Sequence, residues 1–481
     1  MTLDHRAPPI APVRELRASA RRQARTLSGG LLAVVGAAAA LLIVGLLFVL
    51  DYRFEQQAHR LVKLLIGMAG LGAILMRPRL GLFLLPLAIP FLAWMPRIPV
   101  PFLNPDNVLV FGTFFAWIVG RVFTGQPVFR AGRLGPAIGV FVLVTILGLV
   151  RGAAFPLSAS YNAKFAATVL FRATVPFVIY FMGLSMMRGS RDRRWMGGVL
   201  ALGLVAESVA TILCGGNGVG GRSEGSFGQA NELGAFLAMF TCLAAAMLMA
   251  ARSWLPRLAL AAGTAAGIFA IFMSLSRGAM IAVSVGLLFV ALRSSRVMTV
   301  LLLLSLASAP LWLPTNVKQR IASTQVEVDG SDEQAFGAST QKRLNTWQII
   351  LSVAGEHPIE GVGYAGLGGV IVGEATTMGV DTVANTSHNS FLRMLGEMGI
   401  FGLVAFLWLI WACFRLAADG VRRAADRMDR QVAVGLGAAT VALAISCLFG
   451  DRFFQILITG NFWMLCAVVQ DQVLERRERG G

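Results

Sequence analysis

Long apolar runs separated by short polar segments recur along almost the whole chain of 481 residues. About 20 apolar residues in a helix cross the ~30 Å hydrocarbon core of a bilayer. We expect roughly fourteen such spans, although the short second and third runs could instead form one re-entrant pair. The approximate ranges are residues 30–50, 61–76, 80–95, 106–123, 135–150, 165–187, 196–214, 232–251, 255–273, 278–293, 297–314, 392–415, 432–449 and 453–470.

This pattern predicts an all-α polytopic membrane protein with about 12 to 14 transmembrane helices and one large loop that contains short helices. The composition agrees, because 56% of the residues are hydrophobic and only 14% are charged. The predicted parts are a basic tail (1–29), the N-terminal part of the transmembrane bundle (30–313), the large loop (314–389), the C-terminal part of the bundle (390–470) and a C-terminal tail (471–481).

The net charge of +17 does not indicate nucleic-acid binding, because the basic residues form short clusters between apolar runs. Most of these clusters fall in alternate loops, on the same side of the membrane as the N-terminal tail. The positive-inside rule therefore predicts that both termini are cytoplasmic and that the 314–389 loop lies on the outer side.

Four polar motifs fall on the outer side in this topology: "GRSEGSFGQANELG", "SLSRGAM", "RLNTW" and "TSHNSFL". Three of them open spans whose N-termini point outward, and unpaired N–H groups at a helix N-terminus bind anions. Asn231, Ser274 or Ser276, and Ser387 are candidate N-caps. Arg222, Arg277 and Arg343 add guanidinium groups that suit phosphate oxygens, and Trp347 shares a helical face with Arg343. A phosphate or diphosphate at the membrane surface is the expected ligand.

Arg172 is a further candidate for binding a lipid phosphate, because it lies about two turns inside its span, where an unpaired charge is costly. The alternative for Arg172, and for each arginine at a span end, is that the side chain simply reaches the membrane interface. Asp451 and Arg452, between the last two expected spans, rank below these candidates; they could pair with each other or line the same site.

The motifs "MSLSRGAMIAVSVGLL", "HPIEGVGYAG" and "SHNSFLRMLGEMGIFGLVAFL" resemble the O-antigen ligase and polymerase superfamily. The resemblance implies a bacterial inner-membrane enzyme that takes a glycan from undecaprenyl diphosphate on the periplasmic side. It implies that the acceptor is a lipid A core or a growing chain. It also implies that membrane lipids and other polysaccharide assembly proteins are partners. It also identifies Arg277 and Arg343 as functional arginines and His388 as the periplasmic histidine.

The chemistry of glycosyl transfer agrees with these roles. Negative charge develops on the departing diphosphate, where Arg277, Arg343, Arg222 and Arg172 are the candidate clamp. A neutral His388 at a helix mouth suits a general base, and Asn231, Ser276, Asn389 and Trp347 are candidate supporting residues. The sequence shows no metal-ligand spacing and no nucleotide motif, so we expect neither metal nor cofactor.

Two alternatives stay open. A transporter or flippase of lipid-linked glycans would share the many spans and the diphosphate site. Within the enzyme class, the sequence does not separate a ligase from a polymerase, because both need the same donor site and base.

Overall fold

The computed structural model describes residues 77–94 and 105–480, with gaps at 124, 126–127, 217, 219–220, 328–333, 337 and 384–385. All of these residues belong to one compact unit, Glu55–Gly481. The predicted basic tail and the first two expected spans, 30–50 and 61–76, lie outside the described residues.

Within the described part of the chain, nine helices are long and apolar enough to cross a membrane. The predicted all-α polytopic membrane fold is therefore confirmed. The nine helices are α5 (Gly135–Ala154), α6 (Ala163–Met186), α7 (Ser190–Leu213), α8 (Ala230–Leu248), α9 (Trp254–Ser274), α10 (Arg277–Ser294), α16 (Ser390–Arg422), α17 (Arg427–Leu448) and α18 (Ile456–Gly480). Residues 471–480, which were predicted as a separate C-terminal tail, are part of α18.

Three more expected spans coincide with other helices. These are α3 (Pro78–Ala88) with the 3₁₀ helix η1 (Ile89–Trp94), α4 (Pro105–Phe123) and α11 (Arg296–Ala307). The last is shorter than predicted, because its 12 residues cover only about 18 Å. Pro310 and Pro314 follow and break the segment into α12 (Ala309–Trp312) and α13 (Thr315–Ala322).

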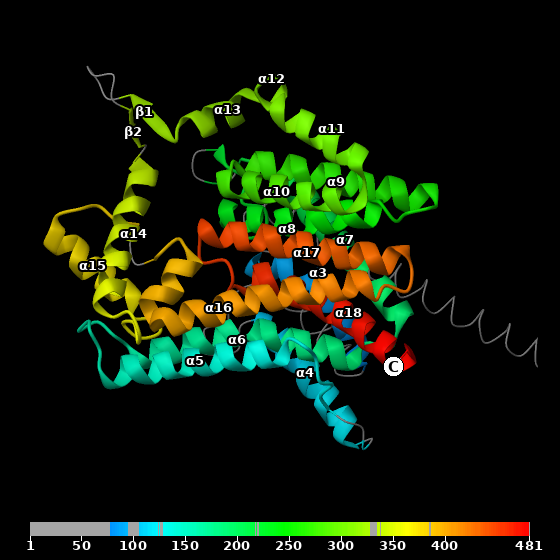
Figure 1. Cartoon of the computed structure of the whole chain (residues 1–481), viewed down its shortest axis with the longest axis horizontal. Coiled ribbons are helices and arrows are strands. Elements are labelled where there is room, and N and C mark those ends of the chain that lie inside the picture. Colours follow the sequence, from blue (N-terminus) through cyan, green and yellow to red (C-terminus); the bar gives the residue numbers. More distant parts are fainter. Residues whose placement is uncertain are drawn as a thin grey trace, which may run out of the picture. The chain divides into compact units, whose positions relative to one another are not determined.

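The long helices lie alongside one another, with the C-terminus at one end of the bundle and the large loop at the other (Figure 1). The α8 and α17 helices pack against each other and against α10, and most of their side chains are buried. On α9 and α11, large apolar side chains such as Leu258, Phe269 and Leu304 remain exposed. Such exposed apolar faces are expected where helices meet lipid.

The predicted 314–389 loop contains α13, α14 (Ala338–Glu356) and α15 (Leu367–Met378), as the sequence indicated. It also contains one short antiparallel strand pair that was not predicted. In this pair, β1 (Gln325–Glu327) joins β2 (Gln334–Phe336), with Gln325 opposite Phe336. The α14 helix ends at Glu356, two residues before Pro358.

The motifs "HPIEGVG" and "GEMGIFG" form the two sides of one junction between the loop and α16. The helix α16 is interrupted at Gly399, whose φ of +61° is readily adopted only by glycine. The freed N–H of Ile400 donates to the carbonyl of Pro358 at 2.8 Å. The N–H of Val362 donates to the Gly396 carbonyl at 2.9 Å, so this junction fixes the loop that follows α14 on the start of α16.

Candidate active site

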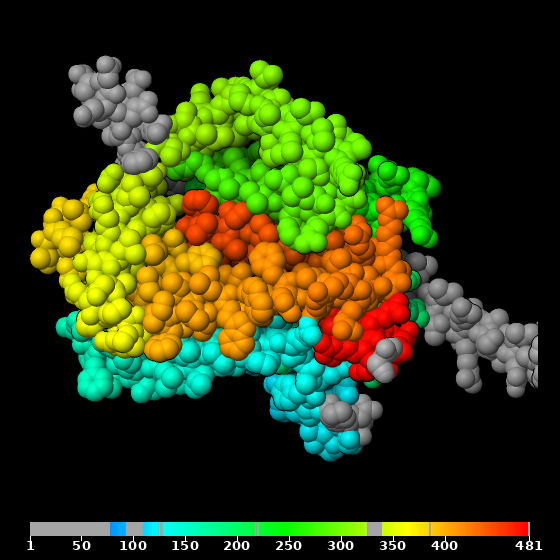
Figure 2. Space-filling model, in the orientation of Figure 1, coloured from blue at the N-terminus to red at the C-terminus, as the bar shows by residue number. Residues whose placement is uncertain are grey.

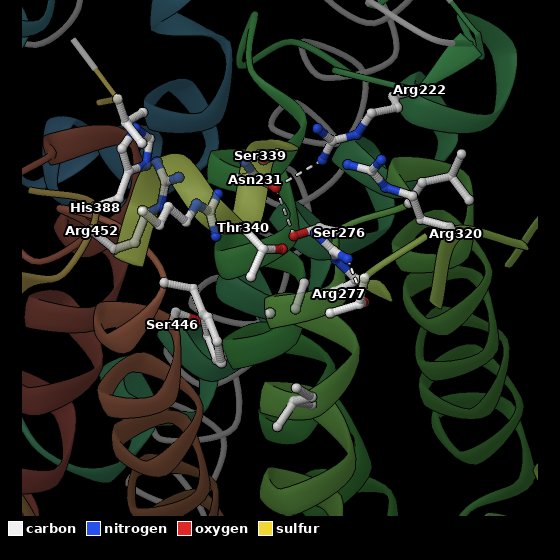
Figure 3. Close-up of a pocket in the computed structure, with 18 of the residues that line it drawn as sticks. Arg222, Asn231, Ser276, Arg277, Arg320, Ser339, Thr340, His388, Ser446 and Arg452 are labelled. Atoms are coloured by element: carbon white, nitrogen blue, oxygen red, sulfur yellow. Dashed lines mark hydrogen bonds between the residues drawn. The ribbon is translucent and has the colours of Figure 1, made fainter. Parts of the chain in front are cut away.

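A cavity of about 410 Å³ opens at the loop end of the bundle. The space-filling view shows the surface hollowed beneath the α11–α13 segment (Figure 2). Its walls come from the starts of α8 and α10, the end of α17, α13, α14 and the segment before α16. We call it the arginine cavity; its polar lining is Arg222, Asn231, Ser276, Arg277, Arg320, Thr324, Ser339, Thr340, Arg343, Trp347, His388, Ser446 and Arg452 (Figure 3).

His388 lies one residue before the N-cap of α16, in a left-handed backbone conformation with φ of +49°. The N-cap is Asn389, whose side-chain oxygen accepts hydrogen bonds from the N–H groups of Phe391 and Leu392. The prediction that Ser387 caps this helix is therefore wrong. The reason is that the Ser387 hydroxyl donates to Asp451 Oδ1 at 2.8 Å and accepts no hydrogen bond from the first turn of α16.

The residues around His388 hold its unusual backbone. The Ser387 hydroxyl also accepts a hydrogen bond from the Asn389 N–H at 3.2 Å, and its carbonyl accepts one from Trp347 Nε1 at 3.0 Å. A non-glycine residue at positive φ is uncommon and persists only where the surroundings fix it. The arrangement holds the imidazole at the cavity wall, where none of the described residues hydrogen-bonds to its ring.

The pKa of His388 is lowered to about 4. Burial is the largest cause, because a buried site disfavours the charged imidazolium. The positive charges of Arg343 and Arg452 lower the pKa further, and the carboxylate of Asp451 opposes them. The imidazole is consequently neutral at pH 7 and has a free nitrogen that can accept a proton.

Five arginines line the arginine cavity, and they differ in how they are held. Arg222 donates from Nε to the Ser274 carbonyl at 3.0 Å, and Arg277 donates to the Thr324 hydroxyl. Arg452 is buried and donates to Glu232 Oε1 at 3.2 Å, behind the cavity wall. Arg343, in the second turn of α14, makes no hydrogen bond to any described residue, so its guanidinium is free to bind a ligand.

The cavity lining contains no Asp or Glu among the described residues. Burial lowers the pKa of Arg343, and the charges of Arg277, Arg452 and Arg320 lower it further. Burial likewise lowers the pKa of Arg222, followed by the charge of Arg320. These shifts show an uncompensated positive potential, which an anion of more than one charge would relieve.

Asn231 and Ser276 connect two of the cavity walls. The Asn231 Oδ1 accepts hydrogen bonds from Arg222 at 2.8 Å and from the Ser276 hydroxyl at 3.0 Å. Asn231 is not the predicted N-cap, because α8 begins one residue earlier and its cap is Gln229. Ser276 is the N-cap residue of α10, although its hydroxyl turns to Asn231 and makes no capping bond.

Arg172 is the candidate arginine that does not reach the arginine cavity, and the candidate supporting residue Asn389 does not line it either. Arg172 lies on α6 with its side chain exposed, next to the buried Ala173. The cavity lining does not include it. Consecutive residues of an α-helix are about 100° apart around its axis, so Arg172 and Ala173 lie on different faces of α6.

Sequence reasoning missed Arg320 and ranked Arg452 low, although both line the arginine cavity. Arg320 lies on the short amphipathic helix α13, and its Nε is buried without a hydrogen-bond partner. The signal for Arg452 was its position in an outer loop between the last two spans. Nothing in the sequence of α13 distinguished Arg320 from the other loop cations, because its position depends on how α11–α13 crosses the bundle.

Comparison with curated proteins gives no match. Residues 262–407 match the family described as O-antigen ligase. The matched segment includes Arg277, Arg320, Arg343 and His388, whereas Arg222 and Arg452 lie outside it. The chain is thus a multi-pass membrane protein with a segment, residues 262–407, that is similar to the O-antigen ligase family. This match confirms the predicted resemblance to the O-antigen ligase and polymerase superfamily.

Proposed function

We propose that the chain transfers a glycan from undecaprenyl diphosphate to a hydroxyl of an acceptor sugar, and that the transfer takes place in the arginine cavity. The observation that carries the proposal is the cavity lining, in which five arginines and His388 converge and the described residues supply no carboxylate. Such a lining suits a diphosphate, which carries more than one negative charge and several acceptor oxygens.

In the proposed reaction, the acceptor hydroxyl oxygen forms a bond to C1 of the donor sugar. The bond between C1 and the phosphate oxygen breaks, and its electron pair leaves with undecaprenyl diphosphate. Arg343, Arg277 and Arg222 stabilise the charge that grows on this leaving group. His388 takes the proton of the acceptor hydroxyl and later releases it to water.

The low pKa of His388 fits this role when the donor is considered. The value of about 4 applies to the empty cavity, and a bound diphosphate would offset the nearby arginines. The pKa of His388 therefore rises when the donor binds, and a base with a pKa closer to the working pH accepts protons more effectively. The proposal includes neither a metal ion nor a cofactor.

We place the protein in the bacterial inner membrane with both termini cytoplasmic and the arginine cavity at the periplasmic side. The expected charge bias of the loops supports this orientation. The donor, the acceptor glycan and the surrounding lipids are then the partners. Contacts with other polysaccharide assembly proteins belong to the same proposal.

Purified protein in liposomes tests the proposal. The assay supplies undecaprenyl diphosphate carrying a labelled glycan, together with an acceptor glycolipid, with and without EDTA. We expect labelled acceptor and an equal amount of free undecaprenyl diphosphate, unchanged by EDTA. Movement of intact donor across the bilayer without release of undecaprenyl diphosphate would instead establish a flippase. Loss of transfer in EDTA with rescue by a divalent ion would overturn the metal-free mechanism.

A deletion strain separates a ligase from a polymerase. The measurement is the size distribution of glycans on undecaprenyl diphosphate. Full-length chains accumulating on the lipid would indicate that the deleted protein is a ligase. Single repeat units accumulating there would indicate a polymerase.

A further inference from the structure

A second cavity, of about 570 Å³, lies at the same end of the bundle as the arginine cavity. Its walls are the start of α6 with the segment before it, α15, the start of α16 and the loop between α17 and α18. The chemistry of its lining differs from that of the arginine cavity. Hydroxyl and amide side chains, the backbone at Gly368 and Gly369, and the aromatic ring of Phe165 replace the cluster of guanidinium groups.

The two cavities share a thin wall. Ser387 lines the second cavity and His388 lines the arginine cavity, and likewise Asp451 lines the second cavity and Arg452 the arginine cavity. Neighbouring residues have Cα atoms about 3.8 Å apart, so each pair spans the wall within one residue. The hydrogen bond from the Ser387 hydroxyl to Asp451 at 2.8 Å connects the two parts of this wall.

The charge of the second cavity is opposite in sign to that of the arginine cavity. Its charged lining residues are Arg393, Glu397 and Asp451, one cation and two carboxylates. Arg393 donates from Nε to Glu397 Oε1 at 3.0 Å and lies 3.9 Å from Asp451. A phosphate would be repelled here, whereas a sugar hydroxyl is a suitable donor for a carboxylate oxygen.

One atom of this lining lacks a partner. Glu397 is 3% exposed, and its Oε2 is buried without a hydrogen bond to the described residues. A buried acceptor without a donor is costly and is rare in native proteins. It indicates that a donor group from a ligand belongs beside Glu397.

We infer that the second cavity binds the acceptor as an uncharged sugar, whose hydroxyl groups donate to Glu397 and Asp451. The inference rests on the proposed function, since it assigns the acceptor to one side of the wall and the diphosphate to the other. His388 then lies at the boundary between the two substrates, where a general base must lie to take a proton from one while the other leaves.

Val372→Trp tests this inference. Val372 lies on α15 at the rim of the second cavity and is half exposed. The larger ring of tryptophan can therefore enter the cavity without disturbing the core. Met378→Trp is the matched control, since Met378 is similarly exposed on the same helix and lines neither cavity. At saturating donor, we expect Val372→Trp to raise the half-saturating acceptor concentration about tenfold or more, with the donor requirement unchanged. Met378→Trp should behave as wild type. An unchanged acceptor requirement in Val372→Trp, and in Val169→Trp from the opposite wall, would overturn the inference.

A binding measurement without donor separates this inference from the proposed function. The probe is phosphate-free oligosaccharide released from the host's own surface glycolipid, observed by saturation-transfer NMR on the full chain in nanodiscs. Binding that is lost in Val372→Trp and retained in Arg343→Ala supports the second cavity as the sugar site, even if the wild type transfers nothing. Binding that survives in Val372→Trp and Val169→Trp places the sugar elsewhere and contradicts the inference.

Discussion

Arginines gather at both ends of the helical bundle, but they have different neighbours at the two ends. At the end near the C-terminus, Arg193 is 3% exposed and contacts Asp471 at 2.9 Å and Asp429 at 3.4 Å. Arg130 contacts Asp471 at 2.6 Å, and Arg79 contacts Asp192 at 2.7 Å. At the loop end, five arginines surround a cavity whose described lining has no carboxylate.

The difference teaches how to separate structural arginines from ligand-binding ones. Buried guanidinium groups that meet carboxylates are already neutralised, and they join α7, α17 and α18. Arginines that meet one another around an empty space lack a counterion within the protein. Arg452 combines both properties, since Glu232 holds it from behind while it lines the cavity.

The largest expected effect is a loss of stability at the end of the bundle near the C-terminus, where the arginines are paired with carboxylates. Arg193→Met leaves buried carboxylates without a partner, and breaking such a pair typically costs about 3–5 kcal/mol. We expect a lower unfolding temperature in detergent and lower accumulation in the membrane. The adjacent Arg194→Met is the control, because its pair with Asp426 is exposed and such pairs contribute about 1 kcal/mol or less. Equal stability of the two variants would contradict the structural role of Arg193.

The next effect concerns the arginine cavity. Arg343→Lys keeps the charge but loses the planar fork, so we expect transfer to fall about 10²- to 10³-fold while the protein accumulates normally. Arg277→Lys should behave in the same way. Lys342→Met is the control, because the Lys342 side chain points outward to Asp381 and does not line the cavity. If Arg343→Lys were unstable rather than inactive, the contrast between the two ends would fail.

A smaller effect is expected at the wall that holds the histidine. Ser387→Ala removes the hydrogen bond to Asp451 that helps to fix the backbone of His388. One hydrogen bond contributes about 0.5–1.5 kcal/mol, so turnover at saturating substrates should fall up to about tenfold while donor affinity stays the same. Thr377→Ala, on the exposed side of α15, should leave turnover at the wild-type level. A donor affinity that falls together with turnover would point to the diphosphate site instead.

The smallest effect near neutral pH is the acid loss of activity. Protonation of His388 removes the base, so the transfer rate per free enzyme should fall on the acid side with a midpoint near 4, below the ordinary value of about 6.5. The midpoint for the donor complex should lie higher, because the diphosphate favours imidazolium. Arg343→Gln should raise the midpoint of the free enzyme by removing one positive charge. A midpoint of about 6.5 in the wild type would show that His388 is not the group described here.

Much of the fold could be predicted from the sequence, because long apolar runs permit few structures. The span at 297–314 was predicted too long, since hydropathy alone does not weigh the effect of Pro310 and Pro314. The strand pair β1–β2 was not predicted, because each strand has only three residues and lies within a polar segment.

The candidate site was predictable where a motif marked a span end. Arg222, Arg277, Arg343, His388 and Trp347 all line the arginine cavity. Arg172 lies on an exposed face of α6 and not at the arginine cavity, because the sequence does not show which side of a uniformly apolar helix faces inward. The positions of Arg320 and of the partners of Arg452 depend on tertiary contacts. Arg452 and its partner Glu232, for example, are more than 200 residues apart in the sequence.

The most direct test of the account measures donor binding and transfer on the same preparation of wild type and His388→Asn. Asparagine tolerates the left-handed backbone at this position and removes the base, so the wall should keep its shape. The account predicts that His388→Asn binds undecaprenyl diphosphate glycan as tightly as wild type and transfers it about 10²- to 10⁴-fold more slowly. Transfer by His388→Asn at the wild-type rate would contradict the account.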